Sequence, residues 1–241
     1  MQNKEKVTAI ILAAGQGKRM NSKIQKQYML LNGLPILYYS LKCFEDSFVD
    51  DIVLVVGKGE EEYCKENFIN KYGFKKVRAI VEGGKERYHS VANGIETINW
   101  DCNYCMIHDG ARPFVTRDIL ERALKTVKDT KACVVGMPIK DTVKIVDDNK
   151  DVESTPTRSK VWQIQTPQSF EFGLIKNSYQ QLISLEEKLI SNGTQITDDA
   201  MVVEYFTDTK VRLVEGSYQN IKITTPDDLY IGEEILQKRE N

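Results

Sequence analysis

A short segment near the start of the chain combines small residues with a high density of positive charge. It reads Leu12-Ala13-Ala14-Gly15-Gln16-Gly17-Lys18-Arg19-Met20, and Lys23 and Lys26 follow. Small residues after a strand let backbone N–H groups approach phosphate oxygens closely. Arg19 offers a planar fork that suits phosphate, and Lys26 offers a mobile point charge. The segment therefore predicts a phosphate-binding loop; the alternative is a tight turn with solvated basic residues.

This loop matches neither of the two common glycine-rich phosphate motifs. A Walker A loop requires an earlier glycine and a Ser or Thr where Arg19 stands. A dinucleotide-binding fingerprint requires a third glycine, which is missing. The loop is therefore not a Walker A loop, and it argues against a dinucleotide-dependent dehydrogenase.

A second group of polar residues follows an apolar run at Asp109-Gly110-Ala111-Arg112. An aspartate at the end of a buried strand suits Mg²⁺, which commonly binds one or two carboxylates together with phosphate oxygens. The alternative is an ion pair between Asp109 and Arg112 that stabilises a turn. Asp109 is therefore one candidate metal ligand, and taken alone the motif favours the ion pair.

The remaining motifs carry little signal one at a time. Gly83 and Gly84 allow close backbone approach to a ligand, and Ser90 offers a hydroxyl at a helix start. The alternative is a loop with a helix N-cap. Arg158 reads equally well as a solvated residue, and Lys222 as a charge that protects a strand edge.

Composition narrows the function classes. The 241 residues are 41% hydrophobic and 28% charged, which is ordinary for a globular protein. The net charge of −2 provides no global field for nucleic acid. No apolar run approaches the ~20 residues of a membrane span. We therefore expect a soluble, cytoplasmic protein that binds neither nucleic acid nor membrane.

The five cysteines are scattered and odd in number. Such a set predicts reduced thiols in a cytosolic protein. Cys102 and Cys105 form a single CxxC, and a structural zinc site would require a second pair or matched histidines. We expect two buried thiols there instead.

The elements that must position these residues alternate between apolar strands and helical patterns. The predicted strands are Val7–Leu12, Asp51–Gly57, Val77–Val81, Tyr104–His108 and Ala132–Met137; the predicted helices are Pro35–Phe44, Glu60–Tyr72, Arg87–Ile98 and Arg117–Asp129. This alternation predicts an α/β fold with a doubly wound, mostly parallel sheet. Ligands bind beyond the carboxyl ends of such strands, so loops 15–26, 83–87 and 109–112 should share one cleft.

The pattern changes after Met137. Residues 138–162 alternate in polarity around turn formers and predict a two-stranded β-arm. An isolated hairpin is marginally stable, so the arm should pack against something, with a second subunit as a natural choice. The tail predicts helices at Phe170–Gln181, from Thr197 to Glu204 and after Pro226, and strands at Val211–Glu215 and Asn220–Thr224. We expect one domain over residues 1–241 that includes this arm.

Taken together, the motifs resemble one known family. The ordered set is LAAGQGKRM, KQY, GG-x-x-R-x-x-S, HDGARP, KDT, R-x-x-x-W-x-x-QTPQ, TDDA and NIKITTP. It resembles the 2-C-methyl-D-erythritol 4-phosphate cytidylyltransferases of the non-mevalonate isoprenoid pathway, from about Val7 to Asp228. Each motif is weak by itself, but their order and spacing are specific.

The resemblance implies a reaction and an assembly. The phosphate of 2-C-methyl-D-erythritol 4-phosphate attacks the α-phosphate of CTP, giving 4-diphosphocytidyl-2-C-methyl-D-erythritol and pyrophosphate with Mg²⁺ present. The resemblance also implies a nucleotidyltransferase fold related to the Rossmann type. It implies a homodimer whose arms exchange, so that each arm helps to build the partner's site.

Residue roles follow from the resemblance position by position. Arg19 and Lys26 match cations that stabilise the α-phosphate during transfer. Arg158 and Lys222 match residues that hold the acceptor's phosphate, and Asp109 matches a carboxylate near the metal. Thr142 and Thr197 match residues that contact the acceptor's hydroxyls, and Thr166 is close by. The residues that match nucleotide contacts are Ala13, Ala14, Gly15, Gly17, Gly84 and Ser90, and Arg112 lies in a matched segment as well.

Elementary chemistry agrees with this set. A phosphate monoester is already anionic, so it needs no general base, and cations and positioning should dominate catalysis. Three positions depart from the common family pattern. Gln25 stands where many members have proline, Lys85 where aspartate is common, and Thr157 where an acidic residue is common. Gln25 puts the rigidity of the Lys26 loop in question.

Two other functions compete with the one that the resemblance implies. Ribitol-5-phosphate cytidylyltransferases share the fold and the chemistry but use another alcohol. The segments Pro156–Trp162 and Thr197–Ala200 fit the methylerythritol enzymes better. A nucleotide-binding regulatory protein without turnover should lack cations at Arg19, Lys26 or Lys222, and all three are present.

Overall fold

The strands and helices build one large sheet with helices on both faces. The computed structural model describes residues 4–15 and 25–240. Its main strands are β1 (Val7–Ala13), β4 (Asp51–Val56), β5 (Val77–Glu82), β6 (Tyr104–Asp109), β7 (Ala132–Pro138), β10 (Trp162–Glu171) and β11 (Arg212–Glu215). Their order across the sheet is β11-β7-β10-β6-β1-β4-β5. The predicted α/β, mostly parallel sheet is confirmed.

Strand β1 lies inside the sheet because both of its faces are apolar. It pairs in parallel with β4 on one side and with β6 on the other. Ala9 and Ile11 pack into the core of one face, and Ile10 packs into the core of the opposite face. Such double burial is what a continuous apolar run in a parallel sheet predicts.

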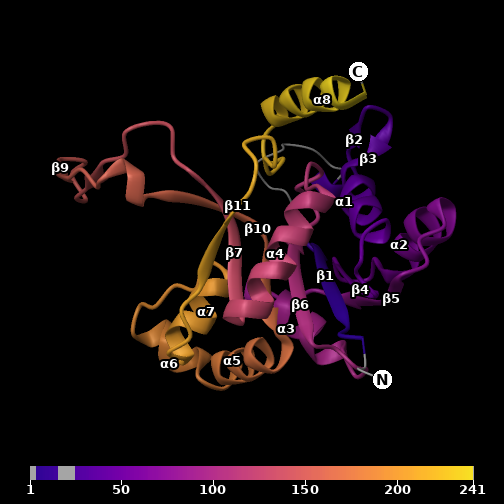
Figure 1. Cartoon of the computed structure of the whole chain (residues 1–241), viewed down its shortest axis with the longest axis horizontal. Coiled ribbons are helices and arrows are strands. Elements are labelled where there is room, and N and C mark those ends of the chain that lie inside the picture. Colours follow the sequence, from indigo (N-terminus) through magenta and orange to yellow (C-terminus); the bar gives the residue numbers. More distant parts are fainter. Residues whose placement is uncertain (1–3, 16–24, 241) are drawn as a thin grey trace.

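The helices form a layer on each face (Figure 1). Helices α1 (Ile36–Glu45) and α4 (Arg117–Thr130) supply residues to the first core, and α3 (Arg87–Thr97), α5 (Phe172–Ser184) and α7 (Asp199–Phe206) supply residues to the second. Helix α8 (Pro226–Glu240) covers a third, smaller apolar cluster that contains Leu31, Ile36 and Phe114. The short elements are η2 (Lys26–Tyr28), β2 (Leu30–Leu31), β3 (Leu34–Pro35), α2 (Glu61–Cys64), η3 (Lys65–Asn70), η4 (Arg158–Lys160) and α6 (Glu186–Ser191).

Strand β10 corrects the predicted start of the Phe170–Gln181 helix. The chain stays extended through Glu171, and α5 begins only at Phe172. β10 runs antiparallel between β6 and β7, so both of its edges are hydrogen-bonded. Its buried residues include Gln165, Thr166 and Gln168, which break the apolar pattern of a central strand. That interruption is why the sequence pattern missed it.

Two further expectations on secondary structure are wrong. Asn220–Thr224 forms no strand; its backbone meets the rest of the fold through Ile223 N–H, which donates to Ala111 O at 2.8 Å. The charged segment Glu60–Tyr72 is not one regular helix, because a π-helical stretch replaces its middle at Lys65–Asn70. The alternation of Ile221 and Ile223 with polar residues predicted a strand, but none of the described strands pairs with that segment.

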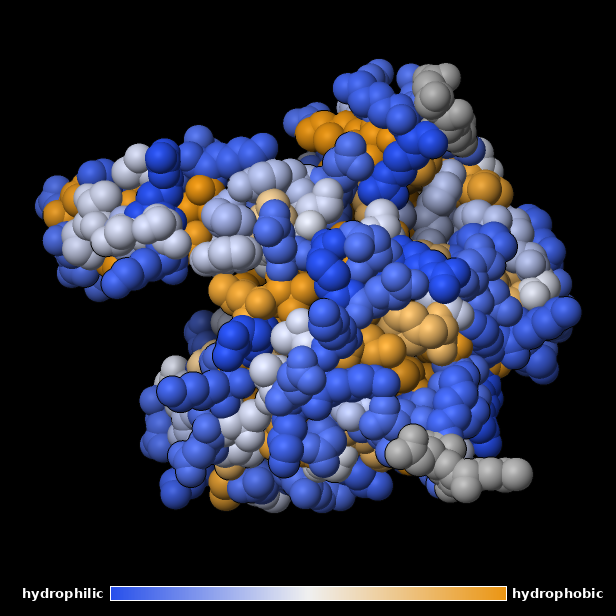
Figure 2. Space-filling model, in the orientation of Figure 1, coloured by the Kyte–Doolittle hydropathy of each residue, from blue (hydrophilic) through white to orange (hydrophobic). Residues whose placement is uncertain are grey.

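The predicted arm leaves the sheet between β7 and β10. It carries the two-stranded ladder of β8 (Ile145–Val146) and β9 (Val152–Ser154) and stands apart from the rest of the molecule, at the left of Figure 1. Ile145, Val146 and Val152 are 47–58% exposed. In Figure 2 a deep notch separates the arm from the part of the molecule below it, which leaves the arm without packing against that part.

Candidate active site

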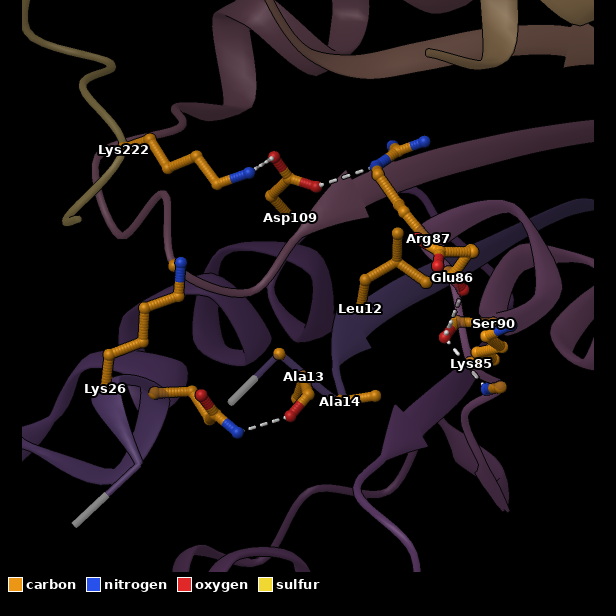
Figure 3. Close-up of a pocket in the computed structure, with 14 residues that line it drawn as sticks. Leu12, Ala13, Ala14, Lys26, Lys85, Glu86, Arg87, Ser90, Asp109 and Lys222 are labelled. Atoms are coloured by element: carbon orange, nitrogen blue, oxygen red, sulfur yellow. Dashed lines mark hydrogen bonds and ion pairs between the residues drawn. The ribbon is translucent and has the colours of Figure 1, made fainter. Parts of the chain in front are cut away.

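A pocket of about 480 Å³ opens at the carboxyl ends of β1, β5 and β6. Ligands bind at this edge of α/β sheets, as expected for the cleft. Figure 3 shows that its side chains come from loops far apart in the sequence. The lining residues are Leu12, Ala13, Ala14, Gly15, Lys26, Gln27, Gly84, Lys85, Glu86, Arg87, Ser90, Asp109, Ala111 and Lys222.

The structure brings eight of the predicted site residues to this pocket: Ala13, Ala14, Gly15, Lys26, Gly84, Ser90, Asp109 and Lys222. Gly17 and Arg19 lie outside the described residues. Thr142 and Arg158 lie in the arm, and Thr197 lies just before α7, where all three are exposed. Arg158 Nη1 donates to the backbone carbonyl of Lys140 at 3.3 Å.

The glycine loop after β5 packs tightly against the loop after β1. A Cβ at Gly83 would fall 2.4 Å from the Ala14 Cβ, and one at Gly84 would fall 2.2 Å from the His89 Cβ. Any side chain at either position would force these segments apart. Gly84 N–H donates to Ser90 Oγ at 3.0 Å, which fixes the loop on the first turn of α3. The N-cap of α3 is Glu86 rather than Ser90.

Asp109 lies among three positively charged side chains at the pocket. Its Oδ2 lies 2.7 Å from Lys222 Nζ and 3.9 Å from Arg112 Nε, and its Oδ1 lies 3.5 Å from Arg87 Nε. Burial by itself would raise the pKa of Asp109. The charges of Arg87, Lys222 and Arg112 outweigh that effect and hold this pKa well below its usual range. Asp109 is therefore ionised at neutral pH, inside a cluster of cations.

Arg112 makes only a long contact with Asp109 because its guanidinium is held elsewhere. Nη1 donates to the backbone carbonyl of Asn220 at 2.8 Å, and Nη2 donates to that of Ile164 at 3.4 Å. Burial lowers the pKa of Arg112, and the charge of Asp109 opposes that effect. Arg112 thus ties the Asp109 loop to the Lys222 segment and does not line the pocket itself.

Lys222 reaches Asp109 from a segment without regular secondary structure. The side chain of Asn220, which is fully buried, donates to Gln165 Oε1 at 3.2 Å and to the Thr166 carbonyl at 3.0 Å. These bonds fasten the segment to the middle of β10. They hold Lys222 close to Asp109, and Figure 3 shows the two side chains facing each other.

Arg87 is a pocket residue in the loop 83–87 that was expected at the cleft, but the sequence predicted no role for it. Its guanidinium donates two hydrogen bonds to Asp199, from Nη1 at 2.8 Å and from Nη2 at 2.7 Å. Asp199 is fully buried and also accepts from Tyr179 Oη at 2.6 Å. The only sequence signal for this ion pair was the presence of an arginine in GG-x-x-R and of a second aspartate in TDDA. Two parallel hydrogen bonds from a guanidinium to a carboxylate make a strong ion pair.

Thr166 and His108 support Asp109 from behind. Asp109 N–H donates to Thr166 Oγ1 at 3.1 Å, and Thr166 Oγ1 lies 3.0 Å from His108 Nδ1. His108 Nε2 lies 3.2 Å from the Arg112 carbonyl, which can only accept. Burial lowers the pKa of His108 to about 4, so the imidazole is neutral and serves as a structural bridge.

Lys26 begins the η2 turn, and its side chain extends into the pocket in Figure 3. Its Cε lies 3.9 Å from where a Cβ on Gly15 would be. The neighbouring Gln27 Nε2 donates to the Ala13 carbonyl at 2.5 Å. The turn that carries Lys26 is therefore attached directly to the loop after β1.

These features define a nucleotide-binding α/β enzyme of the nucleotidyltransferase class. Small residues and glycines line one side of its pocket, and cations gathered around one ionised aspartate line the other. The family model of 2-C-methyl-D-erythritol 4-phosphate cytidylyltransferase matches residues 7–238. The chain belongs to that family, which confirms the resemblance found in the sequence.

Individual relatives agree over almost the full length. A 2-C-methyl-D-erythritol 4-phosphate cytidylyltransferase of Lachnoclostridium phytofermentans is 51% identical and covers 98% of this chain and 99% of its own. One from Alkaliphilus oremlandii is 46% identical, with coverages of 99% and 98%. The crystal structure of 4-diphosphocytidyl-2C-methyl-D-erythritol synthase from Anaerococcus prevotii matches with a TM-score of 0.84 and 33% identity, over 97% of this chain and 96% of that one. Among the described residues, no helix is long and apolar enough to cross a membrane.

Proposed function

We propose that this chain transfers the cytidylyl group of CTP to the phosphate of 2-C-methyl-D-erythritol 4-phosphate and releases pyrophosphate. The observation that carries the proposal is the meeting of Lys26, Lys222 and Asp109 with the Gly84 and Ser90 loop in one pocket, in a chain of this family. In the reaction, an acceptor phosphate oxygen forms a bond to the α-phosphorus. The bond from that phosphorus to the oxygen bridging to the β-phosphate breaks, and pyrophosphate carries the charge away.

The roles of the pocket residues follow from charge. The acceptor phosphate and the triphosphate repel each other, so cations that hold both lower the barrier. Lys26 supplies charge from the side of the Gly15 loop, and Arg19 would supply more from the same loop. Lys222 supplies charge from the opposite side, where Arg158 of a second chain would join it on the acceptor's phosphate. Thr142 and Thr197 would contact the acceptor's hydroxyls.

Asp109 would hold Mg²⁺ only together with the nucleotide. The described residues contain no cluster of three or more His, Cys, Asp or Glu that could bind a metal without help from a ligand. A single ionised carboxylate still suits Mg²⁺, which completes its shell with phosphate oxygens and water. When bound, the ion would neutralise phosphate charge. Asp109 would orient it, and the ionised state of this carboxylate suits that role.

A second subunit would complete the site. Ile145, Val146 and Val152 of the arm are about half exposed, and Arg158 and Thr142 lie in the same arm and do not line the chain's own pocket. A homodimer with exchanged arms covers the apolar surface and delivers both polar residues to the partner's pocket.

The function is tested by pyrophosphate release from CTP with purified protein and Mg²⁺. We expect rapid release with 2-C-methyl-D-erythritol 4-phosphate and little release with ribitol 5-phosphate, and removal of the metal with EDTA should stop the reaction. Equal or greater activity with ribitol 5-phosphate would overturn the choice of acceptor. No release with either alcohol would overturn the enzymatic proposal.

Lys26 is tested by replacing it with alanine. We expect kcat to fall at least ~10²-fold, because charge on the transferring phosphate loses a pre-placed cation. The same loss is expected for Arg19→Ala. Lys58→Ala removes an exposed lysine outside the pocket and serves as the control. Unchanged kcat in Lys26→Ala, measured under saturating CTP, would refute this role.

A further inference from the structure

The turn that carries Lys26 is fastened by a carboxylate that does not line the pocket. We infer that Glu60 is a positioning residue for Lys26, an inference that rests on the proposed function. Glu60 precedes α2, just beyond the carboxyl end of β4. It reaches the turn through Gln25 and Tyr28, the residues on either side of Lys26 and Gln27.

The Glu60 carboxylate is shared among three donors. Oε2 accepts from Tyr28 Oη at 2.8 Å and from Gly57 N–H at 3.1 Å, and Oε1 accepts from Gln25 Nε2. A Cβ at Gly57 would lie 2.6 Å from Glu60 Oε2, so the glycine makes room for the carboxylate. Both carboxylate oxygens therefore accept hydrogen bonds, Oε2 from Gly57 N–H and Tyr28 and Oε1 from Gln25.

Tyr28 is held as a donor by its surroundings. Its ring packs against Tyr63 and Phe68, with centroids 5.4 and 5.2 Å away, and its hydroxyl also lies 3.0 Å from Cys64 Sγ. Burial, with Cys64 and Glu60 close by, raises the pKa of Tyr28 far above its usual value, so the hydroxyl keeps its proton. The aromatic cluster thereby fixes one end of the turn on the α2 segment.

The same network reaches the phosphate loop. Gln27 Nε2 donates to Gln25 Oε1 and to the Ala13 carbonyl. The side chains at 25, 27 and 28 are thus bound to Glu60, to Ala13 and to one another, while the side chain of Lys26 lines the pocket. A shift of the turn would move Lys26 relative to Gly15. Misplacement of a catalytic group by about 1 Å can cost 10²-fold in rate.

The network supplies rigidity by hydrogen bonding at a position that could also be stiffened covalently. Gln25 has φ −62° and ψ 139°, and proline fixes φ near −65°. Proline at position 25 should therefore restrain the same backbone without Glu60. Proline at position 25 would restore the conformation of the turn but not the other contacts of Glu60. Recovery of activity by this proline would therefore indicate that Glu60 positions Lys26, rather than that it contributes to folding in general.

The experiment compares Glu60→Gln with the double variant Gln25→Pro/Glu60→Gln, using pyrophosphate release and thermal unfolding. Glutamine keeps the size of the side chain but has only one accepting oxygen. We expect kcat of Glu60→Gln to fall about 10-fold, with the KM for CTP within about twofold of wild type. We expect the double variant to recover most of the lost kcat. Glu62→Gln, an exposed residue of α2, is the matched control and should behave as wild type.

Three outcomes would overturn the inference. They are an unchanged kcat in Glu60→Gln, a loss that appears only in KM, and a loss that the proline fails to restore although both variants melt near the wild-type temperature. If Glu60→Gln does not fold, Tyr28→Phe removes one donor to the same carboxylate and is judged by the same kcat and KM criteria. An inactive wild type would instead contradict the proposed function, so the two failures are distinguishable.

Discussion

At the scale of single residues, the pocket is organised around charge rather than proton transfer. Its one buried histidine neighbour, His108, is neutral and bridges Thr166 to the Arg112 carbonyl. Asp109 is surrounded by cations that keep it ionised. None of these groups is set up to remove a proton, which agrees with an acceptor that arrives already anionic.

The pH dependence of turnover should therefore follow the substrate. A phosphate monoester loses its second proton near pH 6. We expect kcat/KM for the acceptor to rise up to about pH 7 and then stay level to about pH 8.5, because Asp109 is ionised throughout this range. Steady-state rates measured across this range check the expectation. A bell-shaped profile with a limb that is abolished in His108→Gln would point instead to a general base in the protein.

His108 should make stability depend on pH in a defined window. An unfolded histidine binds a proton near its ordinary pKa of 6.5, whereas the folded one binds it only near 4. The unfolded state therefore binds more protons between these values, and stability falls as pH falls through them. We expect the free energy of unfolding to drop by about 3 kcal/mol from pH 6.5 to 4.

Urea unfolding at several pH values measures this slope. His108→Gln should flatten it, while His89→Gln, which removes the chain's other histidine, should keep it. A slope that survives in His108→Gln would show that other groups control stability in this window.

At the scale of elements, a buried ionic chain holds three helices to the edge of the pocket. Arg87 begins α3, Asp199 begins α7 and Tyr179 lies on α5. Asp199 binds both Arg87 and Tyr179, and Arg87 in turn contacts Asp109 at the end of β6. The helices thus do more than cover the sheet, because the residues that begin α3 and α7 help to set where the pocket's charges lie.

Replacing Asp199 with alanine should loosen this arrangement. Removing one partner of a buried pair costs about 3–5 kcal/mol. We expect the lower end, about 3 kcal/mol, because the Arg87 side chain is 30% exposed and gains water. Tyr179→Phe removes a single hydroxyl donor and should cost about 1 kcal/mol. Urea denaturation tests both, and equal losses in the two variants would contradict the dominance of the ion pair.

At the scale of the whole molecule, the arm is the part that packs least against the rest of the described structure. β8 and β9 form an isolated two-stranded ladder, and Figures 1 and 2 show it extending away from the body. Such ladders are marginal unless they pack against other structure. A two-fold assembly would cover both arms by the same contact.

Exchange of the arms predicts recovery of activity in a mixture of two inactive variants. One chain carries Arg158→Ala and the other carries Lys26→Ala, and they are refolded together. In the heterodimer one site combines an intact Lys26 with an intact Arg158, so random pairing should give about a quarter of wild-type activity. Each variant refolded with itself is the control. Absence of recovery, with heterodimers verified by tagged chains, would mean that each site is built within one chain.

Much of this protein was readable from the sequence because the informative signals are local. Continuous apolar runs predicted β1, β4, β6 and β7, and the residues after β1 and β6 identified two sides of the pocket. The order of the short motifs identified the family. The polar central strand β10 escaped because its buried glutamines and threonine interrupt the apolar pattern. The segment around Lys222 looked like a strand because Ile221 and Ile223 alternate with polar residues.

The sequence by itself determined the chemical groups of this enzyme, and the tertiary structure decided which of them act on one another. Arg87 meets Asp199, 112 positions away, and Asp109 at the end of β6 meets Lys222 from the segment before α8. Gln25, whose effect on loop rigidity the sequence left open, is fastened to Glu60 by a contact that spans 35 positions. Such pairings have no local signature, because they depend on how helices and loops pack at the edge of the sheet.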